Sequence, residues 1–173
     1  MTEDIGKTLS GWWREALRPA DDTSAARALR ARLRRADALE ALAQPQVHDL
    51  VARAPWLRHR PKGLIRVVQV LAHVERNDLR SLARVLGSGD PPAMSRARFE
   101  RLVRSEADEL PRALRRAIVL TEGGCNVATL GRDVLNWDDP ERGEDIRRNW
   151  YFDYFNAARD NAAAEGKTED IAQ

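Results

Sequence analysis

Arginine is the residue type through which this chain could do the most chemistry. The sequence contains 26 Arg and 3 Lys, and a guanidinium contacts a phosphate through paired hydrogen bonds that an ammonium cannot form. Residues 21–120 carry 20 Lys and Arg against 12 Asp and Glu, whereas residues 121–173 carry 6 against 12. A basic body with an acidic end indicates a polyanionic partner, or charge-complementary packing between copies of the chain. A GC-rich genome also favours Arg over Lys, so the composition alone does not indicate phosphate binding. The positions of the arginines must decide whether they form a binding surface.

The arginines recur at helical spacing, away from the apolar faces of three predicted helices. Since a helix turns about 100° per residue, Arg34 shares a stripe with Arg27 and Arg30, and Arg35 lies further round the same helix. Two later helices carry arginines opposite their apolar residues, namely Arg98, Arg101 and Arg104 on the first and Arg112, Arg115 and Arg116 on the second. Such a surface would attract phosphates and release their counterions. Charged residues also belong on the solvent face of any amphipathic helix, which is the ordinary structural interpretation.

Other residue types that form active sites or metal sites are sparse. His48, His59 and His73 fall in different predicted elements, and no HxH or HExxH spacing occurs, so we expect no metal site. Cys125 follows two glycines at a predicted helix start, where a thiolate could be stabilised, but we favour a small buried residue there. The motifs GxxxxGK[ST], GxGxxG and GxSxG are absent from the sequence. We therefore expect neither an enzyme nor a bound cofactor.

The aromatic residues form two groups. Trp12 and Trp13 are adjacent, so they point about 100° apart on a helix, and we expect one in the core and the other against a neighbouring element or subunit. The aromatic block Trp150–Phe155 covers most of a helix circumference. Such a helix is either enclosed by its own bundle or used as an interface.

Apolar residues recur at helical spacing almost throughout, and no segment shows the sustained alternation of a strand. The chain is therefore predicted to be all-α. The most apolar stretch, Leu64–Val74, is rich in β-branched residues, but we predict a buried central helix because Pro61 opens it and it runs unbroken for about three turns. The other predicted helices cover Ile5 to near Pro19, Thr23 (or Asp22) to about Leu42, Val47–Val51, Leu79–Leu86, Ser95–Arg104, Leu110–Leu120, Asn126–Val134 and Ile146–Phe155.

The segment Gly87–Pro92 (Gly-Ser-Gly-Asp-Pro-Pro) is the clearest linker signal in the chain. We place a domain boundary there, which predicts two small helical bundles joined by a Gly/Pro linker, one over residues 1–88 and one over residues 93–160. A chain of 173 residues with 43% hydrophobic content suits one compact domain or two small bundles that share a core. Residues 161–173 are small, polar and acidic, and we expect this tail to fray.

No apolar run approaches the roughly 18–20 residues of a membrane span. The N-terminal residues lack the basic-then-apolar pattern of a signal peptide. We therefore expect a cytosolic protein with no membrane partner.

The order and spacing of several helical motifs resemble those of a known family. The motifs are Ser81-Leu82-Ala83-Arg84-Val85-Leu86 before the linker, Arg98-Phe99-Glu100-Arg101-Leu102-Val103-Arg104 after it, then Leu114-Arg115-Arg116 and Val127-x-x-Leu130-x-Arg132-x-x-Leu135-x-Trp137, with Trp12-Trp13, Leu33-Arg34-Arg35 and Leu64-Ile65-Arg66 upstream. Each motif alone is an amphipathic helix, but their order, spacing and total length over residues 9–155 are similar to those of the CasB-type small subunit of Cascade, the type I-E CRISPR surveillance complex.

The resemblance implies a small, non-catalytic, all-α subunit of an antiviral defence complex. Two copies of such subunits sit head to tail, help to hold the guide RNA–target DNA heteroduplex, and give the displaced DNA strand of the R-loop a basic path. The implied partners are guide RNA and target DNA bound without sequence preference, other Cascade subunits and a second copy of the chain. Family basic positions map onto Arg35, Arg66, Arg98, Arg104, Arg115 and Arg116, and the arginine stripes add Arg34 and Arg101.

Two other functions remain open at this point. A helix-turn-helix transcription regulator would use the helices over Leu79–Leu86 and Ser95–Arg104, but their connection of about eight residues is long for a motif that uses three or four. A helical protein-interaction adaptor would instead pair its arginines with acidic partner surfaces.

Overall fold

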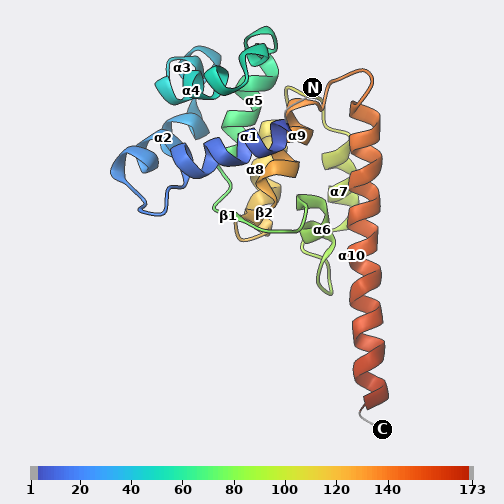
Figure 1. The fold of residues 1–173 in the computed structure, drawn as a ribbon. Coiled ribbons are helices and arrows are strands. Elements are labelled where there is room, and N and C mark those ends of the chain that lie inside the picture. Colours follow the sequence, from blue (N-terminus) through green and yellow to red (C-terminus); the bar gives the residue numbers. More distant parts are fainter. Residues whose placement is uncertain (1–3, 172–173) are drawn as a thin grey trace.

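The structure, a computed structural model, describes residues 4–171. The helices are α1 (Ile5–Trp12), α2 (Ser24–Arg35), α3 (Ala38–Leu42), α4 (Pro45–Arg53), α5 (Pro61–Leu71), α6 (Leu82–Gly87), α7 (Arg96–Val103), α8 (Leu110–Leu120), α9 (Val127–Leu135) and α10 (Gly143–Ile171). A π-helical turn over Trp13–Leu17 extends α1, and a 3₁₀ helix over Pro55–His59 precedes α5. Figure 1 shows α2, α3 and α4 on one side of the molecule, α10 along the other, and α8 and α9 between them. The predicted all-α fold is confirmed.

Side-chain caps explain where several helices begin. The Thr23 hydroxyl accepts from the Ala26 amide at the start of α2 (3.1 Å), and the Asn126 side chain accepts from the Thr129 amide at the start of α9 (2.9 Å). Each cap satisfies one of the amides that a helix N-terminus leaves without a partner. Both residues stand at the predicted starts of their helices, and Thr23 rather than Asp22 caps α2.

The helix predicted from Thr23 to about Leu42 is wrong in its second half, because the chain breaks after Arg35. Ala36 has an extended backbone, and Asp37 and Glu40 form a reciprocal capping box that starts the separate helix α3. Reciprocal hydrogen bonds between an N-cap side chain and the residue three positions later satisfy two free amides. The capping box therefore starts a new helix at a point where the spacing of the apolar residues predicted one continuous helix.

Helix α5 is the central helix of the fold, as predicted. Pro61 occupies its first turn, where a missing N–H costs nothing. Val67, Val68, Val70 and Leu71 are fully buried, and the helix packs against α2, α3, α8 and α9. Burial on nearly all sides explains why its apolar residues do not follow a narrow stripe.

Two very short strands depart from the prediction of a strand-free chain. β1 (Arg76–Asn77) pairs in parallel with β2 (Gly124–Cys125), so that the segment after α5 is joined to the segment after α8. Two residues are too few for a period-2 pattern, which is why the sequence carried no strand signal.

The linker predicted at Gly87–Pro92 does not separate two cores. α6, on its N-terminal side, packs mainly against α10, and α9, on its C-terminal side, packs against α1 and α5. The buried apolar residues form one continuous cluster that extends from Leu9 to Tyr154. Gly87 is the last residue of α6 rather than part of the linker. It allows α6 to lie close against α10, since an added Cβ would lie 2.2 Å from the Tyr154 carbonyl oxygen.

The aromatic residues mostly fill this shared core. Trp12 and Trp13 are both buried and donate to the carbonyls of Gln46 (2.7 Å) and Val74 (3.3 Å). On α10, Trp150 and Tyr154 are buried, whereas Phe152 and Phe155 are exposed.

The tail expected to fray from residue 161 continues the helix as far as Ile171, and residues 172–173 lie outside the described residues. Among the residues that the structure describes, no helix is long and apolar enough to cross a membrane, and no cluster of three or more potential metal ligands occurs.

Candidate nucleic-acid interface

Three of the eight candidate arginines meet in one cleft of about 620 Å³. Arg34 and Arg35 come from the last turn of α2, and Arg115 comes from α8. His73, directly after α5, lines the cleft with them, together with Glu75, Ile118, Val119, Glu122 and Gly123. Helices far apart in the sequence thus supply one basic surface, because α5 packs against both α2 and α8.

The guanidinium of Arg34 is fixed by a backbone contact. Its Nε donates to the Ala72 carbonyl at 2.8 Å, and within the described part of the chain neither terminal nitrogen is hydrogen-bonded, so both can contact a ligand. Partial burial lowers the pKa of Arg34, and the nearby charges of Arg30 and Arg115 lower it further, while Glu75 opposes them. The Arg34 and Arg115 guanidinium groups line the same cleft and repel each other. A phosphate bound between them would offset this repulsion.

His73 lies between these charges and is neutral near pH 7. Burial is the main cause that lowers its pKa to about 4, and the charges of Arg34 and Arg115 lower it further. A neutral imidazole can still donate one hydrogen bond to a phosphate oxygen. Sequence reasoning did not select His73, since an isolated histidine at a helix end carries no motif.

Two carboxylates, Glu75 and Glu122, also line the cleft. Glu75 lies 4.0 Å from Arg18, another residue that sequence reasoning missed. An added Cβ at Gly123, which has a φ of +77°, would meet the Glu75 side chain at 2.8 Å. The absence of a side chain at Gly123 therefore allows the turn after α8 to pack against the Glu75 side chain.

The remaining candidates are distributed over other surfaces. Arg98, Arg101 and Arg104 are exposed on or just after α7, and Arg116 is exposed on α8 beside Arg115. Among the described residues, seven of the eight candidates form no ion pair with a carboxylate, the exception being Arg66. Apart from Arg66, the candidate guanidinium groups are therefore not paired with described carboxylates and can contact a phosphate.

Arg66 is the candidate that the structure removes from this surface. The residue is 4% exposed, and its guanidinium donates to the Val134 carbonyl at 3.0 Å and to Asp138 at 2.6 Å. It links α5 to the segment after α9, because a buried charge requires partners of this kind. A phosphate cannot reach it in this fold.

Cys125 is fully buried, and burial raises the pKa of its thiol to about 12. A thiolate at this position would be costly in apolar surroundings. The preferred prediction, a small buried residue, is confirmed.

Comparison with known proteins places the chain in a family. The family model for the CRISPR-associated protein Cse2 matches residues 29–155. A CRISPR-associated protein Cse2 from Thermus thermophilus is 29% identical over 132 residues, which are 75% of each chain.

Solved structures agree with this match. The crystal structure of CasB from Thermus thermophilus has a TM-score of 0.66 and 26% identity, and the match covers 88% of this chain and 98% of that one. A chain in the crystal structure of E. coli Cascade bound to a PAM-containing double-stranded DNA target has a similar fold, with a TM-score of 0.64, 20% identity, and coverage of 88% of this chain and 97% of that one. The resemblance inferred from the helical motifs is confirmed, and the chain belongs to the family of CRISPR-associated Cse2 (CasB) proteins.

Proposed function

We propose that the protein is a non-catalytic small subunit of a Cascade complex, and that it holds the backbones of the guide RNA–target heteroduplex and the displaced strand. The observation that supports the proposal most is the cleft in which Arg34, Arg35 and Arg115 converge without carboxylate partners among the described residues. Family membership makes a Cascade complex the natural setting, and one relative of the same fold was solved in Cascade bound to target DNA.

The chemistry of the cleft suits a backbone ligand. Guanidinium groups contact phosphate oxygens in pairs, and such contacts position a strand without sequence information. Sequence specificity in a guide-dependent complex comes from base pairing, so a subunit that holds the strand needs no base-edge contacts. We place a second set of phosphate contacts at Arg98, Arg101, Arg104 and Arg116, which form no ion pair with a described carboxylate.

The test is a charge-matched comparison of two triple variants. The cleft variant replaces Arg34, Arg35 and Arg115 by Gln. The control variant replaces Arg27, Arg96 and Arg148 by Gln, three exposed arginines that already pair with Asp22, Glu100 and Asp145. Binding of a labelled single strand is followed by fluorescence anisotropy over a range of salt concentrations, and the lifetime of the R-loop is measured in the assembled complex.

We expect the cleft variant to bind more weakly, with a slope of log K against log salt that is shallower by about 2, since three single-strand contacts contribute about 0.7 each. The R-loop of its complex should also dissociate faster. The control variant should keep most of the wild-type slope. Equal losses in the two variants, or an unchanged R-loop lifetime in the cleft variant, would contradict the proposal.

A further inference from the structure

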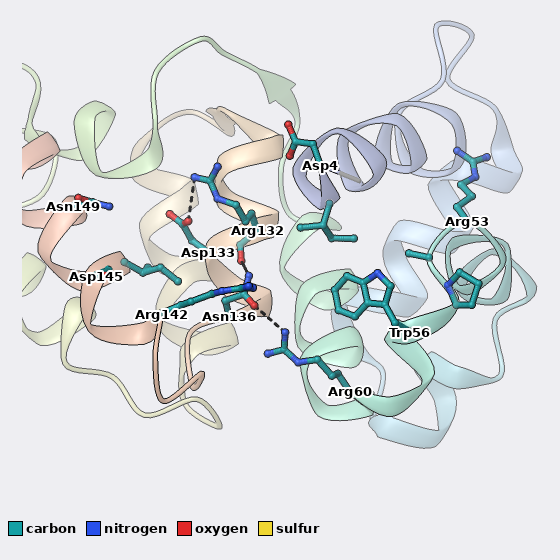
Figure 2. A pocket seen from close by; sticks show the side chains of 14 residues that line it. Asp4, Arg53, Trp56, Arg60, Arg132, Asp133, Asn136, Arg142, Asp145 and Asn149 are labelled. Carbon is teal, nitrogen blue, oxygen red and sulfur yellow. Dashed lines mark hydrogen bonds and ion pairs between the residues drawn. The ribbon is translucent and has the colours of Figure 1, made fainter. Parts of the chain in front are cut away.

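A second cavity, of about 840 Å³, lies at the opposite end of α5 from the basic cleft. The cleft includes His73, just after α5, whereas this pocket includes Arg60, just before it. Its walls come from the start of α1, the 3₁₀ helix Pro55–His59, α9 and the start of α10. Figure 2 shows Trp56 and Arg60 on one side of the pocket, with Arg132, Arg142 and Asn136 on the other. The volume falls in the range of about 300–1,000 Å³ that is typical of small-ligand pockets.

The carboxylates of the pocket are already engaged. Asp133 is buried and accepts from the Trp150 indole N–H at 2.8 Å and from Arg132 at 3.4 Å. Asp145 pairs with Arg148, and Asp4 caps α1 through the Gly6 amide. Asp133 and Asp145 are therefore each paired with an arginine, whereas Asp4 is hydrogen-bonded to a neutral amide and keeps its charge.

The arginines of the pocket are less fully neutralised. Arg60 donates to two neutral acceptors, Asn136 Oδ1 at 2.8 Å and the Leu135 carbonyl at 2.9 Å, and forms no ion pair with any described carboxylate. Arg142 forms no ion pair within the part of the chain that the structure describes, and the guanidinium of Arg132 remains half exposed beside Asp133. The fourth arginine of the lining, Arg53, pairs with Glu15. Four arginines and three aspartates thus line one cavity, which leaves it a net positive charge.

Trp56 adds a planar aromatic surface. Its side chain is 42% exposed at the pocket, whereas Trp12, Trp13, Trp137 and Trp150 are buried. The surrounding sequence is basic, because residues 50–74 contain four Arg and one Lys but no Asp or Glu. An exposed indole among arginines is the combination on which unpaired bases stack while their phosphates are bound.

We propose that this pocket binds one nucleotide of an unpaired strand, with its base stacked on Trp56 and its phosphate held by Arg60, Arg132 and Arg142. The inference rests on the proposed function in treating the protein as a nucleic-acid binder, but it concerns a different site and a different interaction. The cleft binds backbone charge, whereas the pocket recognises the presence of a base.

The experiment compares two labelled single strands with the same number of phosphates, a thymidine oligonucleotide and an abasic one of equal length. Fluorescence anisotropy with the full chain should give about tenfold tighter binding of the thymidine strand, which is within the range for one stacked base. Trp56→Ala should abolish this preference, and Trp56→Phe should restore most of it. Arg142→Gln should weaken both strands equally, with a salt slope that is shallower by about 0.7.

Two controls separate this proposal from the general one. Phe152→Ala removes another exposed aromatic side chain, which does not line the pocket, and should keep the preference. The cleft variant should bind both strands more weakly but keep their ratio. If the cleft variant binds like wild type while the preference depends on Trp56, the backbone proposal fails and the pocket proposal stands.

Three outcomes would overturn the pocket proposal. One is a wild-type protein that binds the two strands equally, and another is a Trp56→Ala variant that keeps the preference with an unchanged melting temperature. The third is a Trp56→Ala variant that binds both strands normally but no longer joins the other subunits, which would make the pocket a docking site for a protein segment instead.

Discussion

The guanidinium of Arg66 on α5 binds the Asp138 carboxylate, with 2.6 Å between Nη2 and Oδ1, and its Nε donates to the Val134 carbonyl. Because Val134 and Asp138 flank the end of α9, one side chain joins the middle of α5 to the segment that leads to α10. Burial raises the pKa of Asp138, but the hydrogen bonds and charge of Arg66 lower it more, so that its net pKa is below the ordinary value.

Arg66→Ala is therefore expected to reduce stability rather than nucleic-acid binding. The change leaves the Val134 carbonyl and Asp138 without their donor, which should cost about 2–4 kcal/mol. Urea denaturation measures the loss. Arg98→Ala, at an exposed position, should change stability by less than about 0.5 kcal/mol. A loss at Arg66 that is no larger than this would show that the contact contributes little.

Gly87→Ala should destabilise the contact between α6 and α10. The new Cβ would lie 2.2 Å from the Tyr154 carbonyl oxygen, so the two helices must separate. We expect a loss of about 1–3 kcal/mol by thermal or urea denaturation. Gly11→Ala is the matched control, because a Cβ there meets nothing within 4 Å, and it should be neutral or stabilising. Similar stability of the two variants would disprove the close approach.

His73 predicts a pH dependence of stability in the acid range. Its folded pKa of about 4 lies below the ordinary value of 6.5, so the unfolded chain binds the proton more readily between these values. Its contribution to stability is therefore fully present above about pH 6.5 and is lost as the pH falls towards 4. His73→Gln should remove this part of the dependence in denaturation curves recorded from about pH 7 to about pH 4.

The same histidine reports on the cleft. A phosphate beside Arg34 and Arg115 would offset their charges and so raise the pKa of His73. An NMR titration of its ring protons, with and without a single-stranded oligonucleotide, should show this upward shift. No shift at saturating oligonucleotide would argue that the strand binds elsewhere.

Asp133 gives a pH dependence of the opposite sign. Burial raises its pKa, although the Trp150 and Arg132 contacts oppose the change. A carboxyl whose folded pKa is raised binds its proton more strongly in the folded state, so its contribution to stability falls as the pH rises through that range. Asp133→Asn keeps an acceptor for the Trp150 N–H and cannot ionise.

The free energy of unfolding of Asp133→Asn relative to wild type should therefore improve as the pH rises from about 3.5 to about 7, as measured by urea denaturation. Asp145→Asn, at an exposed position, should not show this improvement. A constant difference between Asp133→Asn and wild type across the pH range would mean that Asp133 titrates normally in the folded protein.

Parts of the candidate site were visible in the sequence because helical spacing reports which residues share a face. Arg34 and Arg35 next to the end of α2, and Arg115 on the polar side of α8, follow from that spacing. It could not show that the two helices face one cleft, nor that His73 lies between them, since both facts depend on how α5 packs. The aromatic Trp56 escaped notice because its exposure depends on neighbours from α1, α9 and α10.

The sequence by itself determined the all-α class, most helix starts and the family likeness, because caps, prolines and apolar spacing act over a few residues. Tertiary structure alone decided that the two predicted bundles share one core, that Arg66 is buried in an ion pair and that the seven other candidates form no ion pair with any described carboxylate. The physical reason is that burial and charge pairing are set by contacts between residues far apart in the chain, such as Arg66 with Asp138, which no local pattern specifies.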